Sequence, residues 1–214
     1  MTESQTYSTP EGTPYIPIQT KSAEQIYLTS LFKSDAQNMT NLMSTESVAL
    51  ALISPPWPYT IANAEWWINN SLSGKGDLPI CAIRAGNPGP EGKYIGGLGV
   101  IPQDPTGFYH LPGRKPEGWE GEPGSRNVEI GYSLLPEYQG RGIMRPAVRA
   151  AVAWARRECG VQDAIIVVAE GNEKSRAVVE GMEEFVKMEG SKWETWPESK
   201  GGMRRECWSW VWKA

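Results

Sequence analysis

The sequence contains very few residues that could bind a metal or form disulfides. A single histidine, His110, occurs among 214 residues, and the three cysteines, Cys81, Cys159 and Cys207, are far apart in the chain. A structural zinc site needs four ligands of these types at close spacing, so the pattern indicates no metal centre. An odd number of scattered cysteines argues against a disulfide framework and favours reduced thiols, as in a cytoplasmic protein.

Long apolar runs and blocks of like charge are also absent. The longest apolar runs are about six residues, as at 164–169, whereas a membrane-spanning helix needs roughly 18 or more. The formal net charge is −4 without a basic cluster, which argues against a nucleic-acid-binding surface. Residues 1–14 have neither a basic region nor an apolar run, so we expect no secretory signal. We therefore expect a cytoplasmic protein without membrane or nucleic-acid partners.

The composition that remains is typical of one globular domain with long loops. Hydrophobic residues make up 40% of the chain, and a chain of this length can bury a core of its own. Residues 1–22 are rich in Ser, Thr, Pro and Gln without any period, which predicts a flexible tail before a single domain over residues 23–214. Residues 102–126 are rich in Pro and Gly and are expected to form a long loop. His110 lies in this loop, exposed to solvent unless the loop folds over a cleft; only then is it a candidate base.

Periodicity and turn residues predict alternating helices and strands. The expected helices cover residues 35–44, 45–53, 62–72, 144–158 and 172–184. The expected strands cover residues 25–32, 78–84, 94–101, 127–135, 164–169, 185–188 and 206–212. Helices come first, an antiparallel meander follows, and strands then alternate with helices. This order predicts an α/β or α+β fold built on a mixed sheet.

The strongest functional signal is a glycine turn between a strand and a helix, within EIGYSLLPEYQGRGIM at 129–144. The first backbone N–H groups of a helix have no partner inside the helix and lie at the positive end of its dipole. Gly140 and Gly142 remove side chains that would keep a ligand away, and Arg141 and Arg145 add positive charge. The junction therefore predicts an anion site suited to a pyrophosphate, although glycine turns before helices also occur for packing reasons.

At this turn the sequence resembles a known family. The hexapeptide QGRGIM at 139–144 resembles the Gln/Arg-x-x-Gly-x-Gly/Ala signature of the GNAT acyl-CoA N-acyltransferases, with Met144 in place of the last Gly or Ala. The next helix opens with Asn172-x-x-Ser175, as in that family, and PPWPYT at 55–60 precedes EWW. Together these motifs are similar to the branch that contains the Rim-type ribosomal-protein N-acetyltransferases.

The resemblance implies the GNAT fold, with a central, mostly antiparallel sheet of six to seven strands flanked by helices. It also implies acetyl-CoA as co-substrate, without a metal, and direct attack of a primary amine on the thioester. The CoA-binding residues that it implies are Leu134, Leu135, Gln139, Gly140, Arg141, Gly142, Ile143, Met144 and Asn172.

Two catalytic roles follow from the same resemblance. Glu129 matches the position of a general base, and its alternative is a surface carboxylate paired with an arginine. Ser175 is the candidate acid for the leaving thiolate, since the last helix lacks the tyrosine that the family often places there; its alternative is a hydrogen bond within the first turn. The backbone N–H of Leu134 matches the oxyanion donor. Asn172 would bind the pantetheine amides, cap its helix, or do both.

The acceptor side is defined only by aromatic residues. Trp57, Tyr59 and Trp67 lie on the segment that flanks the acceptor groove in this family; Trp66 and Trp67 are adjacent, so at least one of the two is expected to pack. The expected acceptor is a peptide or protein N-terminus or a small amine, and the expected assembly is a monomer or homodimer. The missing tyrosine also motivates an alternative function, a non-catalytic CoA-binding regulatory module.

Overall fold

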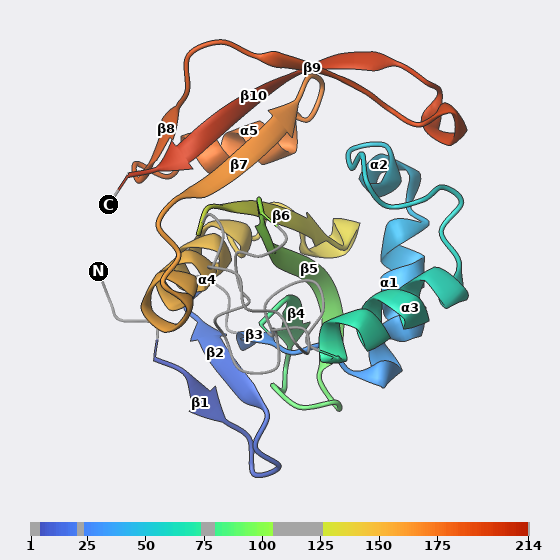
Figure 1. The fold of residues 1–214 in the computed structure, drawn as a ribbon. Coiled ribbons are helices and arrows are strands. Elements are labelled where there is room, and N and C mark those ends of the chain that lie inside the picture. The colour runs from blue at the N-terminus through green and yellow to red at the C-terminus, as the bar shows by residue number, and fades with distance from the viewer. Residues whose placement is uncertain (1–4, 21–23, 74–79, 105–125, 214) are drawn as a thin grey trace, which may run out of the picture.

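The computed structural model describes residues 5–20, 24–73, 80–104 and 126–213, and one large mixed sheet runs through them (Figure 1). Its ten strands follow the order β1-β2-β3-β4-β5-β6-β7-β10-β8, with β9 paired to β10 outside this path. The strands are β1 (Tyr7–Ser8), β2 (Pro14–Ile18), β3 (Ile26–Thr29), β4 (Ala82–Ala85), β5 (Lys93–Pro102), β6 (Val128–Leu134), β7 (Ala164–Ala169), β8 (Phe185–Lys187), β9 (Lys192–Thr195) and β10 (Arg204–Trp212). Every pair is antiparallel except β6 with β7.

In the described residues, five α-helices and three short 3-10 helices accompany the sheet. The α-helices are α1 (Ala36–Met43), α2 (Glu46–Ala49), α3 (Ile61–Leu72), α4 (Met144–Cys159) and α5 (Glu173–Glu180). The 3-10 helices are η1 (Lys33–Asp35), η2 (Pro136–Tyr138) and η3 (Glu198–Lys200). Helix α3 begins after Thr60, whose side chain accepts a hydrogen bond from the backbone N–H of Asn63, and α4 ends at Gly160 with φ of 63°. Local chemistry at these ends thus fixes where both helices start or stop.

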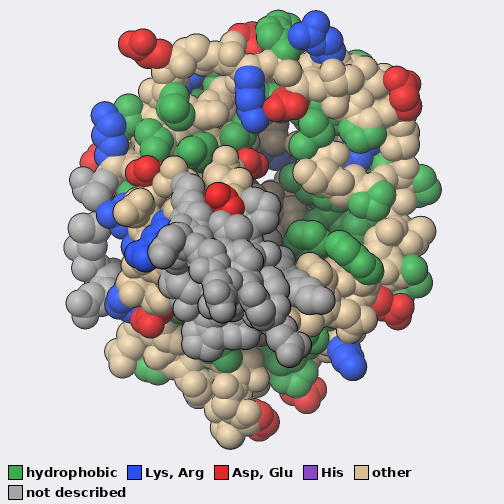
Figure 2. Space-filling model, in the orientation of Figure 1, with side chains coloured by type: hydrophobic (Ala, Val, Ile, Leu, Met, Phe, Trp, Pro, Cys, Tyr) green, Lys and Arg blue, Asp and Glu red, His purple; other side chains and the backbone are tan. Residues whose placement is uncertain are grey.

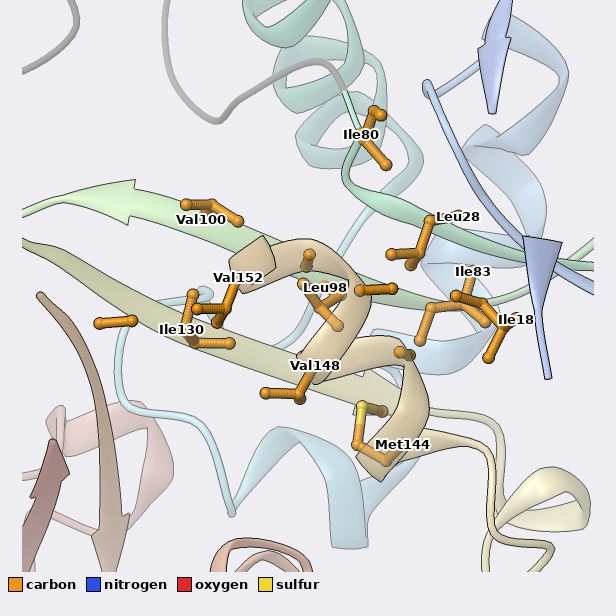
Figure 3. Close-up of a cluster of buried hydrophobic side chains, with 14 of the residues drawn as sticks. Ile18, Leu28, Ile80, Ile83, Leu98, Val100, Ile130, Met144, Val148 and Val152 are labelled. Carbon is orange, nitrogen blue, oxygen red and sulfur yellow. The ribbon is translucent and has the colours of Figure 1, made fainter. Parts of the chain in front are cut away.

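Both faces of the sheet are covered, and each face has its own buried cluster. Ile83 of β4 packs in the cluster that includes α4, whereas its neighbour Ala82 packs with α1 and α3. Successive side chains of a strand point to opposite faces, so α4 lies on one face and α1 with α3 on the other. In the larger cluster, Val148 and Val152 of α4 lie among side chains of β5 and β6 (Figure 3).

The sheet opens between its two parallel strands. β6 and β7 share only two paired positions, Val128 with Ala164 and Glu129 with Ile165. Beyond them, β6 continues to Leu134 and β7 to Ala169, but the two strands no longer pair with each other. The second half of each strand therefore borders a gap in the sheet.

The expected mixed α/β architecture is confirmed, and the sheet is larger than the six or seven strands expected. The structure differs most in the segment expected to be a flexible tail, because β2 lies there and buries Ile16 and Ile18 against the core. The prolines at 14 and 17 conceal this alternation in the sequence, since proline is uncommon inside strands. The expected domain boundary at residue 23 stays a prediction, and most of the expected loop, with His110, lies outside the described residues.

None of the helices in the described ranges is long and apolar enough to cross a membrane.

Candidate active site

A large cleft occupies the gap where β6 and β7 separate. Its volume is about 1650 Å³, and residues from both parts of the sheet and from α1, α3, α4 and α5 line it. The surface is hollowed at the corresponding position, between β7 and α2 (Figure 2). The expected site residues that line the cleft are Glu129, Leu134, Gln139, Gly140, Gly142, Ile143, Met144, Asn172, Ser175, Tyr59 and Trp67, whereas Leu135, Arg141 and Trp57 do not line it.

The backbone of Leu134 faces this gap. Leu134 lies opposite Gly96 of β5, and the next residue, Leu135, donates its N–H to Ile95 O over 2.9 Å. In an antiparallel ladder this bond makes the Gly96–Leu134 pair the non-hydrogen-bonded kind, so the N–H and C=O of Leu134 point away from β5. The carbonyl accepts a hydrogen bond from Gln139 Nε2 over 2.8 Å. The N–H is thus directed toward the side on which β7 has moved away.

The glycine turn places several free backbone donors of the described chain at the start of α4. Gly140 and Gly142 have φ of 74° and 73°, a region that glycine adopts without strain. Within the described chain, the backbone N–H groups of residues 140–144 have no recorded acceptor. The 16-residue helix α4 adds the positive end of its dipole at the same place. The turn therefore provides an open site for an anion.

The Met144 side chain does not block this turn. Met144 is only 8% exposed and belongs to the core cluster under α4. Figure 3 places it at the first turn of α4, on the side of the helix that carries Val148. A long side chain is thus accommodated where the family signature has glycine or alanine.

Of the two arginines expected at the turn, Arg145 lines the cleft and Arg141 does not. The Arg141 guanidinium lies 4.8 Å from the ring centre of Tyr138 and 3.8 Å from Glu24, outside the cleft lining. Arg145 Nη2 donates to the carbonyl of Ala177 in α5 over 2.6 Å. Lys174, which the sequence analysis overlooked, instead places its ammonium beside the turn and donates to Gln139 Oε1 over 2.7 Å. Its position inside the Asn172-x-x-Ser175 motif was the available signal.

A hydroxyl group in the first turn of α5 lies next to a hydroxyl group of β6. Asn172 Oδ1 accepts the backbone N–H of Ser175 over 3.2 Å, so the capping role of Asn172 is present. Ser175 Oγ lies 2.8 Å from the Tyr132 hydroxyl of β6. Burial raises the pKa of Tyr132 to about 12, and the hydrogen bond from Ser175 opposes that rise. Tyr132 was also not predicted as a site residue. The available signal was its place two residues from both Ile130 and Leu134, which puts all three side chains on one face of the strand.

Glu129 lies at the last position of β6 that pairs with β7, where the gap between these two strands begins. Its Oε2 accepts a weak hydrogen bond from Gln103 Nε2 over 3.4 Å, and no ion pair with an arginine or lysine is recorded for it in the described chain. Lys192 forms its ion pair with Glu194 over 3.0 Å. The pKa of Lys192 is raised mainly by this hydrogen bond to Glu194, and its attraction to Glu129 adds to the rise. A carboxylate that has no ion pair among the described residues thus lines the cleft.

Aromatic residues line the opposite wall of the cleft. Tyr59 and Trp67 pack against the cluster formed by α1 and α3, while the adjacent Trp66 is 64% exposed. The Tyr59 hydroxyl lies 3.7 Å from Met39 Sδ, and burial raises its pKa. The expectation that one of the adjacent tryptophans packs is confirmed for Trp67.

A hairpin joins the two sides of the cleft. β9, η3 and β10 reach across to the segment after α2, as Figure 1 shows. Trp196 Nε1 and Arg205 Nη1 both donate to Leu50 O, over 3.1 and 3.0 Å. Lys200 Nζ donates to the carbonyls of Leu52 and Ile53, is only 3% exposed, and has a pKa lowered by burial. We call these contacts the hairpin bridge; no sequence signal predicted them.

The residues described contain no group of three or more His, Cys, Asp or Glu side chains able to hold a metal ion.

Comparison with known proteins connects this geometry to a family. A family model described as "Acetyltransferase (GNAT) domain" matches residues 25–183. A segment of 56 residues is 43% identical to "Putative ribosomal N-acetyltransferase YdaF" of Bacillus subtilis (strain 168) and covers 26% of this chain. The match spans only 31% of that relative's length.

Solved acetyltransferase structures share the fold over most of the chain. RimL, a ribosomal L7/L12 alpha-N-protein acetyltransferase, has 16% identity and a TM-score of 0.65, covering 97% of this chain and 98% of its own. Spermidine N-acetyltransferase from Vibrio cholerae, solved with CoA and spermine, has 16% identity and a TM-score of 0.63, covering 88% and 94%. Mycobacterium smegmatis RimJ, solved with CoA-disulfide, has 16% identity and a TM-score of 0.62, covering 91% and 84%. At these identities the comparison shows a common fold.

Proposed function

The chain belongs to the GNAT acetyltransferase family, and from this premise we propose that it transfers an acetyl group from acetyl-CoA to a primary amine. The observation that carries the proposal is the turn at residues 140–144, whose backbone N–H groups have no acceptor among the described residues and which lies at the end of a gap in the sheet. Such a turn binds a diphosphate through its N–H groups and the helix dipole. The gap gives the attached thioester a path toward the opposite face.

The diphosphate would bind at the turn between Gln139 and Met144. Gly140 and Gly142 leave the space above the N–H groups open, because an added Cβ at either position meets no atom within 4 Å. The Lys174 ammonium lies beside the turn and would add a direct charge. Arg141 would contribute through its backbone N–H, since its guanidinium is held by Tyr138 and Glu24.

The thioester would lie in the gap next to Leu134. The Leu134 N–H is oriented to donate to the oxyanion that develops on the thioester oxygen, a contact that is strongest in the transition state. The N–H of Leu135 would not reach the ligand, because it is bonded to Ile95 O, and Leu135 does not line the cleft. Asn172 would hold the pantetheine arm in addition to capping α5.

The amine must lose a proton before or during its attack. At pH 7 deprotonation costs roughly 1 kcal/mol for an α-amine and about 4–5 kcal/mol for a lysine, from their reference pKa values. Glu129 would accept this proton, directly or through water, because it lines the cleft and forms no ion pair with any of the described residues. Ser175 would place its hydroxyl next to the leaving sulfur.

The acceptor proposed first is the α-amine of a protein or peptide, and a small amine is the second choice. The names of YdaF and RimL support the first, and that of the Vibrio cholerae enzyme supports the second. Trp57, Tyr59 and Trp67 would flank the acceptor, with Tyr59 and Trp67 in the cleft wall. We further propose a cytoplasmic location, as the reduced cysteines favour.

One observation favours a second function, a CoA-binding module without catalysis. Helix α5 contains no tyrosine, and the buried Val179 occupies its inner face. Such a module would be stabilised by CoA without turning it over.

The test combines binding with turnover on the complete chain. CoA should raise the melting temperature, and acetyl-CoA should release free thiol only when peptides with a free N-terminus or small amines are added. Stabilisation without thiol release on any amine would favour the CoA-binding module. The absence of both would contradict a CoA site of either kind.

A further inference from the structure

Two hydroxyl groups from different elements meet in the cleft. Tyr132 lies on β6 and Ser175 on α5, which follows β7, and their side-chain oxygens are 2.8 Å apart. The Tyr132 hydroxyl also lies 3.4 Å from the Ser175 carbonyl. Both residues line the cleft. The contact therefore connects the two parts of the sheet that separate at this point.

Both ends of the contact are fixed by the fold. Ser175 sits in a first helical turn that Asn172 caps through the Ser175 N–H. The Tyr132 side chain packs against the core cluster that includes α4. Because each hydroxyl is held by its own element, their geometry does not have to be assembled when a ligand enters, which is what proton transfer in a transition state requires.

We propose that Tyr132 and Ser175 form a hydroxyl relay that protonates the sulfur leaving the thioester. The inference rests on the proposed function. After the amine nitrogen has bonded to the carbonyl carbon, the C–S bond breaks and its electron pair stays on sulfur. The sulfur takes the Ser175 hydroxyl proton while Ser175 takes the Tyr132 proton, so a thiol and a phenolate result. The phenolate then recovers a proton from solvent. Glu129 releases to solvent the proton that it took from the amine, so the protons balance.

The chemistry of the two groups explains why a pair is needed. A serine hydroxyl alone is a weaker acid than a phenol, even one whose pKa burial raises to about 12, as it does for Tyr132. The Tyr132 phenol is protonated at neutral pH, and the hydrogen bond from Ser175 stabilises its phenolate form. Tyr132 thus acts through Ser175 and supplies the acidity that α5, which has no tyrosine, does not provide.

The decisive experiment is a double-mutant cycle with Tyr132→Phe, Ser175→Ala and both together. Each single variant should lower kcat about 10- to 100-fold, within or just below the usual range for general acids, with the KM for acetyl-CoA changed less than about twofold. The double variant should be no slower than the slower single variant, because either change breaks the same relay. A double loss equal to the product of the single losses would overturn the relay.

The matched control is Tyr138→Phe. Tyr138 is also a buried tyrosine that lines the cleft, but its hydroxyl lies 3.5 Å from Glu24, and the described residues show no hydrogen bond from it to Ser175. This variant should retain full kcat. Circular dichroism and CoA titration of every variant separate loss of folding from loss of catalysis. A Tyr132→Phe variant that folds, binds CoA and keeps full kcat would disprove the inference while leaving the transferase proposal intact.

A second measurement does not depend on turnover. In protein labelled with [¹³Cζ]tyrosine, CoA should shift the Tyr132 resonance, whereas desulfo-CoA, which lacks the thiol, should not. The difference should disappear in Ser175→Ala, because the sulfur is sensed through that hydroxyl. Equal shifts with both ligands, or no shift with either, would show that the pair does not meet the sulfur. This result would count against the relay whether or not an acceptor has been found.

Discussion

At the scale of single residues, two groups proposed to act in the reaction lie on the same strand, β6. Glu129 lies where the pairing of β6 and β7 ends, and Leu134 lies five residues further along the same strand. Both residues border the gap, and five residues at about 3.3 Å each separate the proposed base from the proposed oxyanion donor by about 16 Å along the strand. The Glu129 side chain would therefore reach the amine through water, as proposed above.

Replacing Glu129 tests its role as base. Glu129→Gln should reduce kcat/KM about 100-fold at pH 7, because the amine must then lose its proton without help. The loss should shrink as the pH rises toward the pKa of the amine, since an increasing fraction of the acceptor is already neutral. Initial rates between pH 6.5 and about 9.5 provide the measurement. Glu137→Gln, on an exposed residue paired with Lys93, serves as control, and an unchanged pH profile in Glu129→Gln would remove Glu129 as base.

Replacing Lys174 tests which cation serves the diphosphate. Lys174→Met should weaken CoA binding about tenfold, as expected for an exposed charge-assisted hydrogen bond. The loss should become smaller at high salt, because an exposed charge is screened. Calorimetric titration with CoA at two salt concentrations measures the change in affinity. Lys187→Met, which replaces an exposed lysine of β8, is the control. Equal affinities in the two variants would rule out Lys174 as a phosphate ligand.

At the scale of elements, the turn between β6 and α4 brings strand, glycine conformation and helix dipole to one place. Gly142→Ala should destabilise the fold by about 1–2 kcal/mol, since an L-residue is strained at φ of 73°. It should also reduce CoA affinity at least tenfold, because the methyl group enters the space above the N–H groups. Urea denaturation and CoA titration measure the two effects separately.

Gly12 provides a matched control for that change. It has φ of 83° in the turn between β1 and β2, and an added Cβ there also meets no atom within 4 Å. Gly12→Ala should therefore show a similar loss of stability with unchanged CoA affinity. If both alanine variants bind CoA like the parent, the turn does not hold the diphosphate.

Elements with clear local signals were predictable from the sequence. The alternation from Val128 to Leu134, the glycines of the turn and the apolar run at β7 each specify their structure locally, and the observed bounds lie close to those expected. β1, β2 and β9 were not predicted. They are short, contain proline or exposed residues, and owe their existence to pairing with strands distant in the chain.

The same distinction applies to the site. The turn and the Asn172 cap follow from neighbouring residues, so the sequence pattern was informative. The Tyr132–Ser175 and Lys174–Gln139 contacts join residues 43 and 35 positions apart, and they exist only because the sheet brings β6 beside α5. No periodicity or short motif encodes such a contact.

At the scale of the whole molecule, the cleft lies between two parts of the sheet. Strands β1 to β6 form the first part, and β7 to β10 form the second, which the hairpin connects to the segment after α2. The buried pair of Arg84 and Asp35, joined by hydrogen bonds of 2.6 and 3.0 Å, fastens η1 to β4 within the first part. The hairpin bridge connects the second part to the end of α2. Opening of the bridge would widen the proposed acceptor side without disturbing the turn proposed to bind CoA.

Lys200 allows the bridge to be tested through pH. Lys200→Met keeps most of the side-chain volume but leaves the carbonyls of Leu52 and Ile53 without this donor, so the free energy of unfolding should fall by about 1–3 kcal/mol at pH 7. Burial lowers the pKa of Lys200 in the folded protein, so between that value and the unfolded value of about 10.4 the unfolded chain binds more protons. Stability from this residue therefore rises with pH in that window.

Urea denaturation at pH 7 and near pH 10 should show the parent gaining stability relative to Lys200→Met. The control Lys33→Met, which replaces an exposed lysine, should follow the parent. A difference between parent and Lys200→Met that stays constant or narrows as the pH rises would show that the charge of Lys200 is not buried in the bridge.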